Sequence, residues 1–294
     1  MIDKLEMLIA LAREEHFGRA AESIGVTQPS LSGGIKQLEA QLGVQLVWRG
    51  SRYGGLTPEG QRALEWARRI VGDARSLRQE MRAVHEGLSG TLRIAVIPTA
   101  LTVAARLTGA FCSAHPGVNV SVLSRSSVEI LQMIEGLEAD AGVTYLDNEP
   151  LGRMVTVPLY SEEYHLVCPV GSPLAGREVV AWGDLGAEPL CLLTPDMQNR
   201  RIVNQMLFDA GVAPEVRVES NSTVVLMSHV EDGGWSTILP RETAMFLAAG
   251  RDVRCVPIRQ GRAAHSVGLI APWREPHTPV LEALIDAGRS LRSR

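Results

Sequence analysis

A short stretch near the N-terminus carries side chains that could recognise DNA. Residues 28–36 read QPSLSGGIK, in which Gln28, Ser32 and Lys36 recur every four residues and therefore share one helix face. In a major groove Gln and Ser can hydrogen-bond base edges and phosphates, Lys can contact phosphate or guanine, and Pro29 can touch a thymine methyl. The alternative interpretation is an ordinary solvated face of an amphipathic helix.

A second group of candidate residues lies where predicted strands end and helices begin. Hydroxyl and amide side chains follow the strands LRIAVI, VNVSVL, LCLL and VRVE, and an α/β sheet binds ligands beyond the carboxyl ends of its strands. Helix N-termini there favour a small anion. Each residue alone is more often a helix cap, but four similar strand ends favour a shared site. The predicted ligand-binding residues at these ends are Thr99, Ala100, Arg125, Ser126, Ser127, Thr194 and Asn221.

Two short helices joined by a tight turn would position the DNA-contacting face. Ala20 and Ala21 are small enough for two helices to approach closely, and Gly25 supplies the turn between them. The second helix is predicted from residue 28 to about residue 42, with Thr27 as its N-cap. Its apolar stripe, at helical spacing, is Leu31, Ile35, Leu38 and Leu42.

This N-terminal region resembles the winged helix-turn-helix of LysR-type transcriptional regulators. The family pattern has two alanines, a V-x-Q-P-x-x-S turn and helix start, an I-x-x-L-E-x-x-L-G run, a step with Leu and Arg, and an L-T-x-x-G close. The matching residues are Ala20, Ala21, Val26, Gln28, Pro29, Ser32, Ile35, Leu38, Glu39, Leu42, Gly43, Leu46, Arg49, Leu56, Thr57 and Gly60. The departures are Val47 and Trp48 near the usual Phe, and Gly33 with Gly34 in the recognition helix, which predict fewer direct base contacts.

DNA binding must depend on local placement rather than on net charge, because the formal charge of the chain is −4. For two arginines beside the Gly54 and Gly55 turn, contact with phosphate or the minor groove is favoured over a solvated hairpin. The predicted DNA-contacting residues are Thr27, Gln28, Pro29, Ser30, Ser32, Lys36, Arg49 and Arg52. The partner is double-stranded operator DNA, together with RNA polymerase if the protein activates transcription.

A long helical pattern follows the wing. Its apolar stripe is longer than one chain is expected to bury, so it favours a coiled-coil dimer over coverage by the rest of the chain. The predicted pairing residues are Leu64, Ala67, Val71, Ala74, Leu77, Met81 and Val84. The family resemblance implies that such dimers join into a tetramer.

The remainder of the chain alternates strands with helices in two similar halves. Through its family, this region resembles the two-lobed bacterial solute-binding proteins of the periplasm, and the resemblance implies an effector between the lobes. The predicted organisation is a winged helix-turn-helix at 1–58, a linker helix at 59–87, a hinge at 88–91 and an α/β effector-binding domain at 92–294. Within that domain, lobe I spans about 92–162 and 267–294, and lobe II about 163–266.

Two further features of the sequence bear on the effector. Where the family reads V-x-x-G-x-G, this chain has VEDGGWSTILP, so Trp235 either narrows the cleft around a very small effector or packs beneath the hinge. The stretches VTQPSLSGGIKQLE, TPEGQRALEWARRIVGDAR and LRIAVIPTAL resemble the subgroup that regulates formate dehydrogenase operons. That resemblance implies formate or another small carboxylate as the effector.

Several functions are disfavoured by what the sequence lacks. It has no G-x-S-x-G, phosphate-binding glycine loop, H-E-x-x-H or paired metal-ligand spacing, so neither catalysis nor a metal or cofactor is expected. It has no long apolar span or signal peptide, which predicts a cytoplasmic protein without membrane contact. Its four scattered cysteines favour packing over redox chemistry. The alternatives are a redox-responsive regulator that uses cysteine, and a two-lobed small-molecule-binding protein or enzyme.

Overall fold

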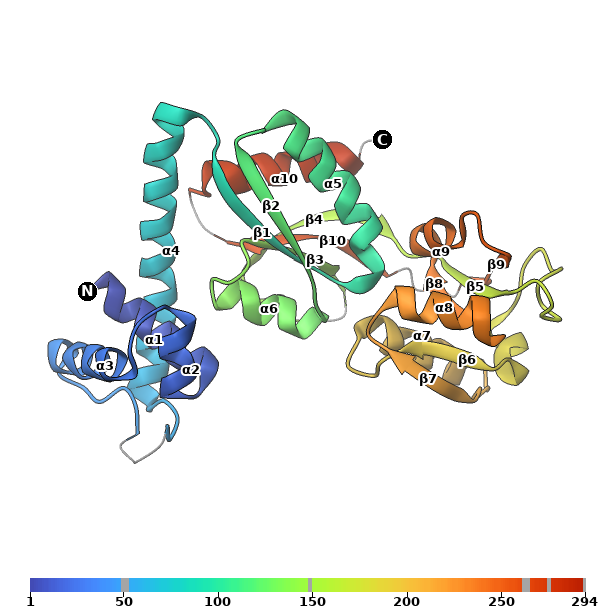
Figure 1. Cartoon of the computed structure of the whole chain (residues 1–294), viewed down its shortest axis with the longest axis horizontal. Coiled ribbons are helices and arrows are strands. Elements are labelled where there is room, and N and C mark those ends of the chain that lie inside the picture. Colours follow the sequence, from blue (N-terminus) through green and yellow to red (C-terminus); the bar gives the residue numbers. More distant parts are fainter. Residues whose placement is uncertain (49–52, 148–149, 261–264, 274–275, 293–294) are drawn as a thin grey trace. The chain divides into compact units, whose positions relative to one another are not determined.

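The computed structural model describes residues 1–48, 53–147, 150–260, 265–273 and 276–292 (Figure 1). The chain forms two compact units. The first comprises Met1–Leu88, Met133–Glu138 and Pro276–Pro279, and the second comprises Ser89–Gln132, Ala139–Glu275 and Val280–Arg294. The break after Leu88 falls within the predicted hinge.

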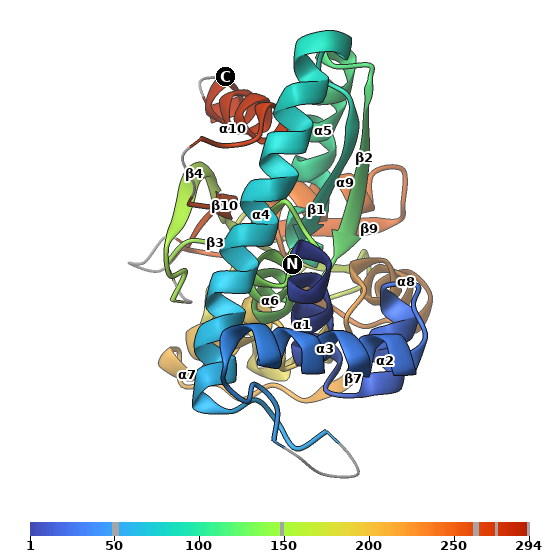
Figure 2. The ribbon, with the colours of Figure 1, turned by 90° about the vertical axis from the view of Figure 1, so that its left-hand side faces the viewer.

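The first unit confirms the predicted helix-turn-helix followed by a long helix. Its helices are α1 (Ile2–Glu14), α2 (Phe17–Ser23), α3 (Gln28–Leu42) and α4 (Pro58–Glu86). Figure 2 shows α1 and α3 beside the lower part of α4. Large apolar side chains from α1 and α3 form its core, with Leu8, Leu11, Leu31 and Leu38 fully buried. This core fixes which face of α3 points outward.

Local hydrogen bonds set the ends of these helices. The Thr27 hydroxyl accepts from the backbone N–H of Ser30 and caps α3, and Gly43 ends that helix with a φ of 71°. The Thr57 hydroxyl accepts from the N–H of Gly60 at 2.9 Å and donates to the carbonyl of Gln45 at 2.6 Å. The start of α4 is thereby tied to the strand that enters the wing, where Val47 and Leu56 form an antiparallel bridge.

One predicted core residue of α3 is exposed. Leu42 retains 46% of its surface, whereas Leu31, Ile35 and Leu38 of the same stripe are buried. Leu42 is the last residue of the helix, so its side chain extends past the core formed by α1 and α2. The prediction that it is buried is therefore wrong.

Lobe I of the second unit is a five-stranded sheet with strand order β2-β1-β3-β10-β4. The first three strands are parallel and the other two are antiparallel to their neighbours. Its strands are β1 (Gly90–Val96), β2 (Val118–Ser124), β3 (Ala141–Tyr145), β4 (Met154–Ser161) and β10 (Ser266–Pro272). Its helices are α5 (Leu101–Ala114), α6 (Ser127–Glu135) and α10 (Pro279–Arg292). Because β10 returns to this sheet, lobe I consists of two separate parts of the chain.

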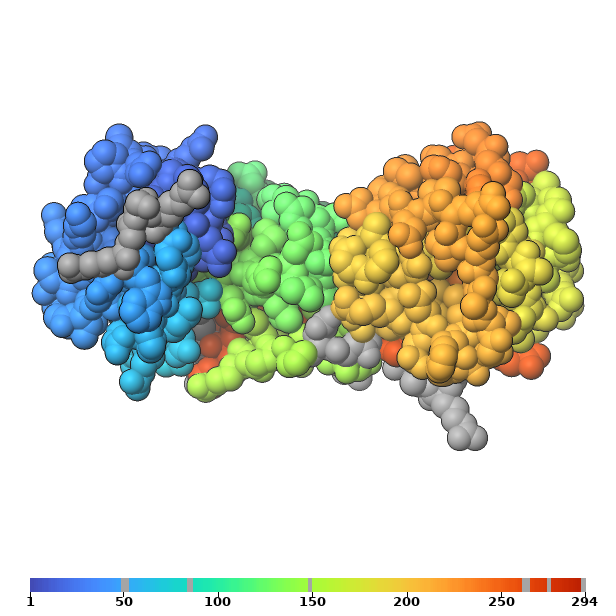
Figure 3. All heavy atoms as spheres, turned by 90° about the horizontal axis from the view of Figure 1, so that it is seen from below, coloured from blue at the N-terminus to red at the C-terminus, as the bar shows by residue number. Residues whose placement is uncertain are grey.

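Lobe II contains a three-stranded sheet, β8-β5-β9, and a parallel pair, β6-β7. Its strands are β5 (Tyr164–Pro169), β6 (Leu190–Leu193), β7 (Val216–Ser220), β8 (Thr237–Pro240) and β9 (Val253–Pro257). Its helices are α7 (Gln198–Asp209), α8 (Thr223–Gly233) and α9 (Arg241–Ala248). In Figure 3 the gold to orange part of the chain, which includes β7 and α8, covers one face of this lobe. The two-lobed α/β architecture is as predicted, although the sequence analysis did not identify β4, β5 or β9.

A close approach between backbone segments requires glycine at the start of α4. A β-carbon on Gly60 would overlap the carbonyl oxygen of Leu46, a backbone atom that cannot move without shifting the wing. Gly33 of α3 is different, because no atom lies within 4 Å of the place that its β-carbon would occupy.

We expect Gly60→Ala to lower the free energy of unfolding by about 1–3 kcal/mol, the usual cost of overpacking. Gly33→Ala is the matched control and should raise it by about 0.5–1 kcal/mol, because alanine restricts the unfolded chain and favours helix. Urea unfolding followed by circular dichroism measures both changes. Equal unfolding midpoints for Gly60→Ala and the wild type would contradict the close approach.

Candidate functional site

The outward face of α3 carries the residues that the sequence predicts to touch DNA. Gln28, Pro29 and Lys36 are exposed and Ser32 is half-buried, on a helix whose other face is packed into the core. Thr27 and Ser30 are exposed too, but their hydroxyl oxygens lie 2.8 Å apart and hydrogen-bond each other. Their side chains therefore already serve the helix cap. The predicted contacts at Arg49 and Arg52 lie outside the described residues.

Glu39 is a positioning residue to which the sequence analysis assigned no role. Its Oε1 accepts hydrogen bonds from the backbone N–H groups of Leu46 at 2.8 Å and Val47 at 3.2 Å. The carboxylate thus links the end of α3 to the strand that leads into the wing. The match of Glu39 to the family pattern was the available signal, but a pattern does not say which distant amides a carboxylate will meet.

The predicted pairing stripe of α4 divides into two parts. Leu64, Ala67 and Val71 are at most 6% exposed and belong to the core of the first unit. This corrects the prediction that these three residues face a partner chain, because the chain's own helices already cover them. Ala74 is half-buried, and the side chain of Val84 lies outside what the structure describes.

A different set of apolar residues on α4 remains uncovered. Trp66, Ile70, Leu77 and Met81 are 62%, 37%, 58% and 51% exposed. At about 100° per residue they lie within about 60° of arc on the helix, beside the buried face. We call these four residues the exposed stripe. Large apolar groups aligned over four turns fit a pairing surface better than scattered exposure does.

The polar residues predicted at the ends of β1 and β2 lie at one edge of the lobe I sheet. The N–H of Arg125, just after β2, donates to the carbonyl of Val96 at the end of β1 at 2.9 Å. Thr99 and Ser127 are each 1% exposed, and neither hydroxyl oxygen has a hydrogen-bond partner. Ala100, beside Thr99, is fully buried. Two buried hydroxyls without partners at one sheet edge are suited to binding a polar ligand.

The other predicted ligand residues differ among themselves. The Ser126 hydroxyl is paired with Glu129 at 2.8 Å, so it serves as a helix cap. The Arg125 guanidinium donates to the adjacent Ser124 carbonyl, and Asn221 is exposed. In lobe II, the half-buried Thr194 has a buried hydroxyl oxygen without a partner.

Trp235 packs against the hydrophobic core of lobe II, among residues that include Val230 and Leu239. This contact supports packing over the alternative that Trp235 narrows a ligand site. Two pockets in the described part of the chain, one lined by Tyr160 and Glu162 and one by Leu101 and Phe246, contain neither Trp235 nor any other predicted ligand residue.

A buried carboxyl group lies where the chain crosses from lobe I to lobe II. Glu162, between β4 and β5, is 4% exposed. Its Oε2 accepts from the hydroxyls of Tyr145 at 2.8 Å and Tyr164 at 2.6 Å. Asn199 at the start of α7 donates its amide to the Tyr145 oxygen at 3.3 Å. This network joins both lobes, and Tyr145 and Asn199 are too far from Glu162 in sequence for spacing to have revealed it.

Burial raises the pKa of Glu162 to about 7, although the hydrogen bonds from Tyr164 and Tyr145 and the nearby polar side chains of Thr99 and Asn199 lower it in part. The Thr99 hydroxyl therefore lies near this carboxyl, without donating a well-aligned hydrogen bond. Thr99 is also held from lobe II, because the hydroxyl of Thr243 on α9 donates to its carbonyl at 2.6 Å. The titratable carboxyl group of Glu162 thus lies beside Thr99, a predicted ligand-binding residue.

Three of the four cysteine thiols are kept protonated by burial. Burial raises the pKa of Cys168, and it raises the pKa of Cys191 and of Cys255 to about 11. In the β5–β9 pair Cys255 is opposite Val167, so the side chains of Cys168 and Cys255 project to opposite faces of the sheet. These sites do not favour a reactive thiolate or a disulfide between these two residues. Cys112 is half-buried on α5.

Two other kinds of site, a metal-binding cluster and a membrane-spanning helix, are absent from the described ranges. No three or more His, Cys, Asp and Glu side chains there are grouped so that they could hold a metal ion. No helix there has both the length and the apolar composition needed to span a membrane.

Both parts of the chain match known protein families. Residues 2–61 match the family of bacterial regulatory helix-turn-helix proteins of the lysR type, and residues 85–291 match the LysR substrate binding domain. A hydrogen peroxide-inducible genes activator from Dickeya chrysanthemi is 31% identical over 240 residues, which cover 81% of this chain and 78% of the relative. The DNA-binding transcriptional dual regulator OxyR of Escherichia coli is 28% identical, covering 96% and 94%.

Solved structures have the same architecture. A full-length OxyR variant from Pseudomonas aeruginosa has a TM-score of 0.74 at 25% identity, covering 98% of this chain and 94% of that one. CbnR in complex with its target DNA has a TM-score of 0.63 at 24% identity, covering 99% of each chain. The relatives named here are regulators rather than enzymes. None has a name that refers to formate, so the resemblance to the formate dehydrogenase subgroup is not supported.

We expect Leu77→Glu to dissociate the oligomer, because it places a charge in the exposed stripe. An unpaired buried charge costs about 3–5 kcal/mol, which corresponds to a dimer Kd raised about 100-fold or more. Gln79→Glu, which adds the same charge on the opposite face of α4, is the control and should leave the Kd unchanged. Analytical ultracentrifugation measures both variants. An unchanged oligomer for Leu77→Glu would show that the exposed stripe does not pair chains.

Proposed function

The chain belongs to the LysR family of bacterial transcriptional regulators, and we propose that it binds operator DNA as a cytoplasmic homo-oligomer controlled by a small ligand in its two-lobed domain. One observation carries the DNA-binding part. The outward face of α3 presents Gln28, Pro29 and Lys36 to solvent while its apolar face is buried. A face of this kind can enter a major groove and hydrogen-bond base edges. The exposed stripe supports pairing, which would present two such helices to two half-sites.

The roles on α3 can be separated by mutation. Gln28→Ala or Ser32→Ala should reduce discrimination between operator and random DNA by about 1–3 kcal/mol if the side chain contacts a base. Lys36→Ala should weaken binding to all DNA and lower the dependence of affinity on salt, because a phosphate contact releases a counterion. Fluorescence anisotropy over a salt series, with DNA from upstream of the protein's own gene, measures both effects.

The control for this experiment is Lys4→Ala, which removes a half-buried positive charge from α1 rather than from α3. Affinities equal to wild type for all three α3 variants would rule out this face as the DNA contact. Absence of any preference by the wild-type protein for the upstream DNA would contradict the choice of operator.

The ligand part of the proposal is supported by hydroxyls that lack partners. Thr99, Ser127 and Thr194 each have a buried hydroxyl oxygen with no hydrogen-bond partner. A buried polar group left unpaired costs about 1–3 kcal/mol, and a ligand that hydrogen-bonds it recovers that cost. A small carboxylate is the proposed ligand at Thr99 and Ser127, because hydroxyls and nearby helix starts stabilise negative charge.

The position of Glu162 makes this binding depend on pH. A carboxylate ligand beside Thr99 would be repelled by an ionised Glu162, whose pKa is raised to about 7. Below that pH Glu162 is neutral and the ligand binds. Above it the apparent affinity should fall by up to about tenfold per pH unit, because binding then requires uptake of a proton.

We expect Thr99→Val to keep the fold while weakening binding of the small carboxylate by about 1.5–3 kcal/mol, the contribution of a hydrogen bond to a charged group. Melting-temperature shifts and calorimetry with formate, acetate and larger carboxylates, between about pH 6 and pH 8, measure both effects. Thr108→Val, on a half-buried part of α5, is the matched control. Equal affinity in Thr99→Val, or the absence of any active carboxylate, would contradict the ligand assignment.

A peroxide-responsive regulator is the second candidate, because relatives of this chain are named hydrogen peroxide-inducible genes activators. Peroxide reacts with thiolates. The raised pKa values of Cys168, Cys191 and Cys255 keep these three as thiols near neutral pH. The chemistry of these cysteine sites therefore favours a ligand-responsive regulator over a thiol-based one.

A further inference from the structure

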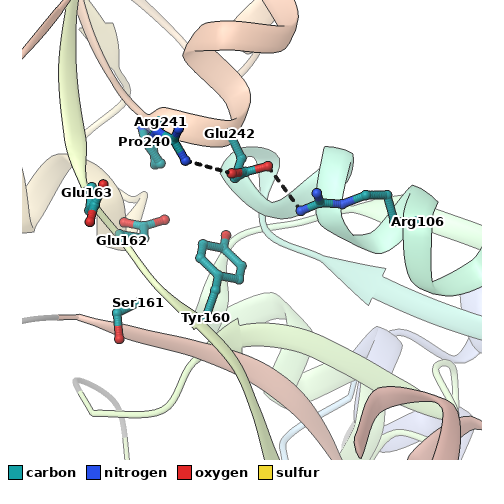
Figure 4. A pocket seen from close by; sticks show the side chains of 8 residues that line it. All are labelled: Arg106, Tyr160, Ser161, Glu162, Glu163, Pro240, Arg241 and Glu242. Carbon is teal, nitrogen blue, oxygen red and sulfur yellow. Dashed lines mark ion pairs between the residues drawn. The ribbon is translucent and has the colours of Figure 1, made fainter. Parts of the chain in front are cut away.

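A pocket of about 200 Å³ lies at the crossing between the lobes. Figure 4 shows its walls, with Arg106 from α5, residues 160–163 from the crossing, and Arg241 and Glu242 from the start of α9. Since a water molecule occupies about 30 Å³ in the liquid, the pocket holds about six or seven groups of that size. This volume suits a small metabolite.

Oxygen atoms without a hydrogen-bond partner line part of the pocket. Glu162 lines it and is 4% exposed, and while Oε2 is bonded by two tyrosines, Oε1 has no partner. The buried hydroxyl oxygen of Tyr160 also has no partner, and Figure 4 shows it directed toward Glu242. Glu163 adds an exposed carboxylate to this side. Unpaired carboxylate and phenol oxygens are complementary to an ammonium group, which donates up to three hydrogen bonds.

Two arginines of the pocket share one carboxylate. Arg106 pairs with Glu242 at 3.1 Å, and Arg241 pairs with the same carboxylate at 3.7 Å. Two guanidinium groups with five N–H donors each thus share a single acceptor group. A second carboxylate could accept from both arginines in the geometry that guanidinium groups favour.

The pocket carries both negative and positive side chains, so a ligand with charge of only one sign would meet repulsion from some of them. An anion would face three glutamates, and a cation would face two arginines. We propose that the pocket binds a small zwitterion of the α-amino-acid class, with its ammonium group at Glu162 and Tyr160 and its carboxylate at Arg106 and Arg241. This site is separate from the proposed carboxylate site at Thr99 and Ser127, and it does not depend on DNA binding.

The test uses the full-length protein and the common α-amino acids, each at about 10 mM, in a melting-temperature screen. The pH is about 8, so that Glu162, with its pKa raised to about 7, is ionised. At least one amino acid should raise the Tm. Calorimetry then compares that amino acid with its decarboxylated amine and its deaminated carboxylate, each of which should bind at least about tenfold more weakly because half of the recognition is lost.

Two variants separate the two ends of the ligand. Glu162→Gln should weaken binding of the amino acid about tenfold without weakening binding of its deaminated carboxylate, and Arg106→Gln should weaken binding of the amino acid about tenfold while leaving binding of its amine unchanged. Glu178→Gln removes an exposed glutamate outside the pocket and should behave as the wild type. Arg106 is 59% exposed, so its replacement preserves the fold.

Failure of every amino acid to raise the Tm would overturn the proposal. So would an unchanged preference for the amino acid over its amine in Arg106→Gln. Thr99→Val should bind the amino acid with the affinity of the wild type. This variant therefore distinguishes a failure of the amino-acid proposal from a failure of the proposed carboxylate site.

Discussion

Burial of an ionisable carboxyl where the chain passes between its lobes is the constraint on which the ligand-binding domain depends. Glu162 is almost fully enclosed, and an isolated charge there would be very costly. Groups from both lobes compensate: Tyr145 and Tyr164 donate to the carboxyl, and Asn199 donates to Tyr145. Burial and the nearby carboxyl raise the pKa of both tyrosines, so they remain donors. The contact between the lobes is therefore sensitive to the charge of one group.

The first unit depends on a simpler constraint, which is that an amphipathic helix can bury only part of its surface. In α3 the burial of Leu31, Ile35 and Leu38 leaves exposed the polar face that we propose contacts DNA. In α4 the chain's own core covers Leu64, Ala67 and Val71. The next face of the helix, with the exposed stripe, keeps much of its apolar surface exposed. In both helices, the proposed function uses the face that the core leaves exposed.

The sequence predicted those features that depend on local pattern. The helix-turn-helix, the length of α4, the two lobes and the return of the chain at β10 all follow from periodicity, caps and turns. The sequence pattern did not distinguish the two apolar faces of α4. Trp66 and Ile70 can be recognised as a separate exposed face only once the structure shows that the neighbouring apolar residues are buried in the core. The sequence pattern also missed Glu162, because the role of a single glutamate depends on hydrogen bonds from tyrosines on other strands. Ser126 and Thr99 look alike in sequence, but a hydrogen bond to Glu129 occupies only the former.

The position of Glu162 between two proposed ligand sites has a consequence that neither site has alone. A carboxylate beside Thr99 favours the neutral form of Glu162, whereas an ammonium group in the neighbouring pocket favours the ionised form. Each ligand therefore opposes the other through a shared proton, and by thermodynamic reciprocity each must weaken the other by the same factor. This antagonism requires no change in how the lobes are arranged. Its size is set by how far the pKa of Glu162 lies from the ambient pH, and that pKa, raised by burial to about 7, lies where either ligand can move it.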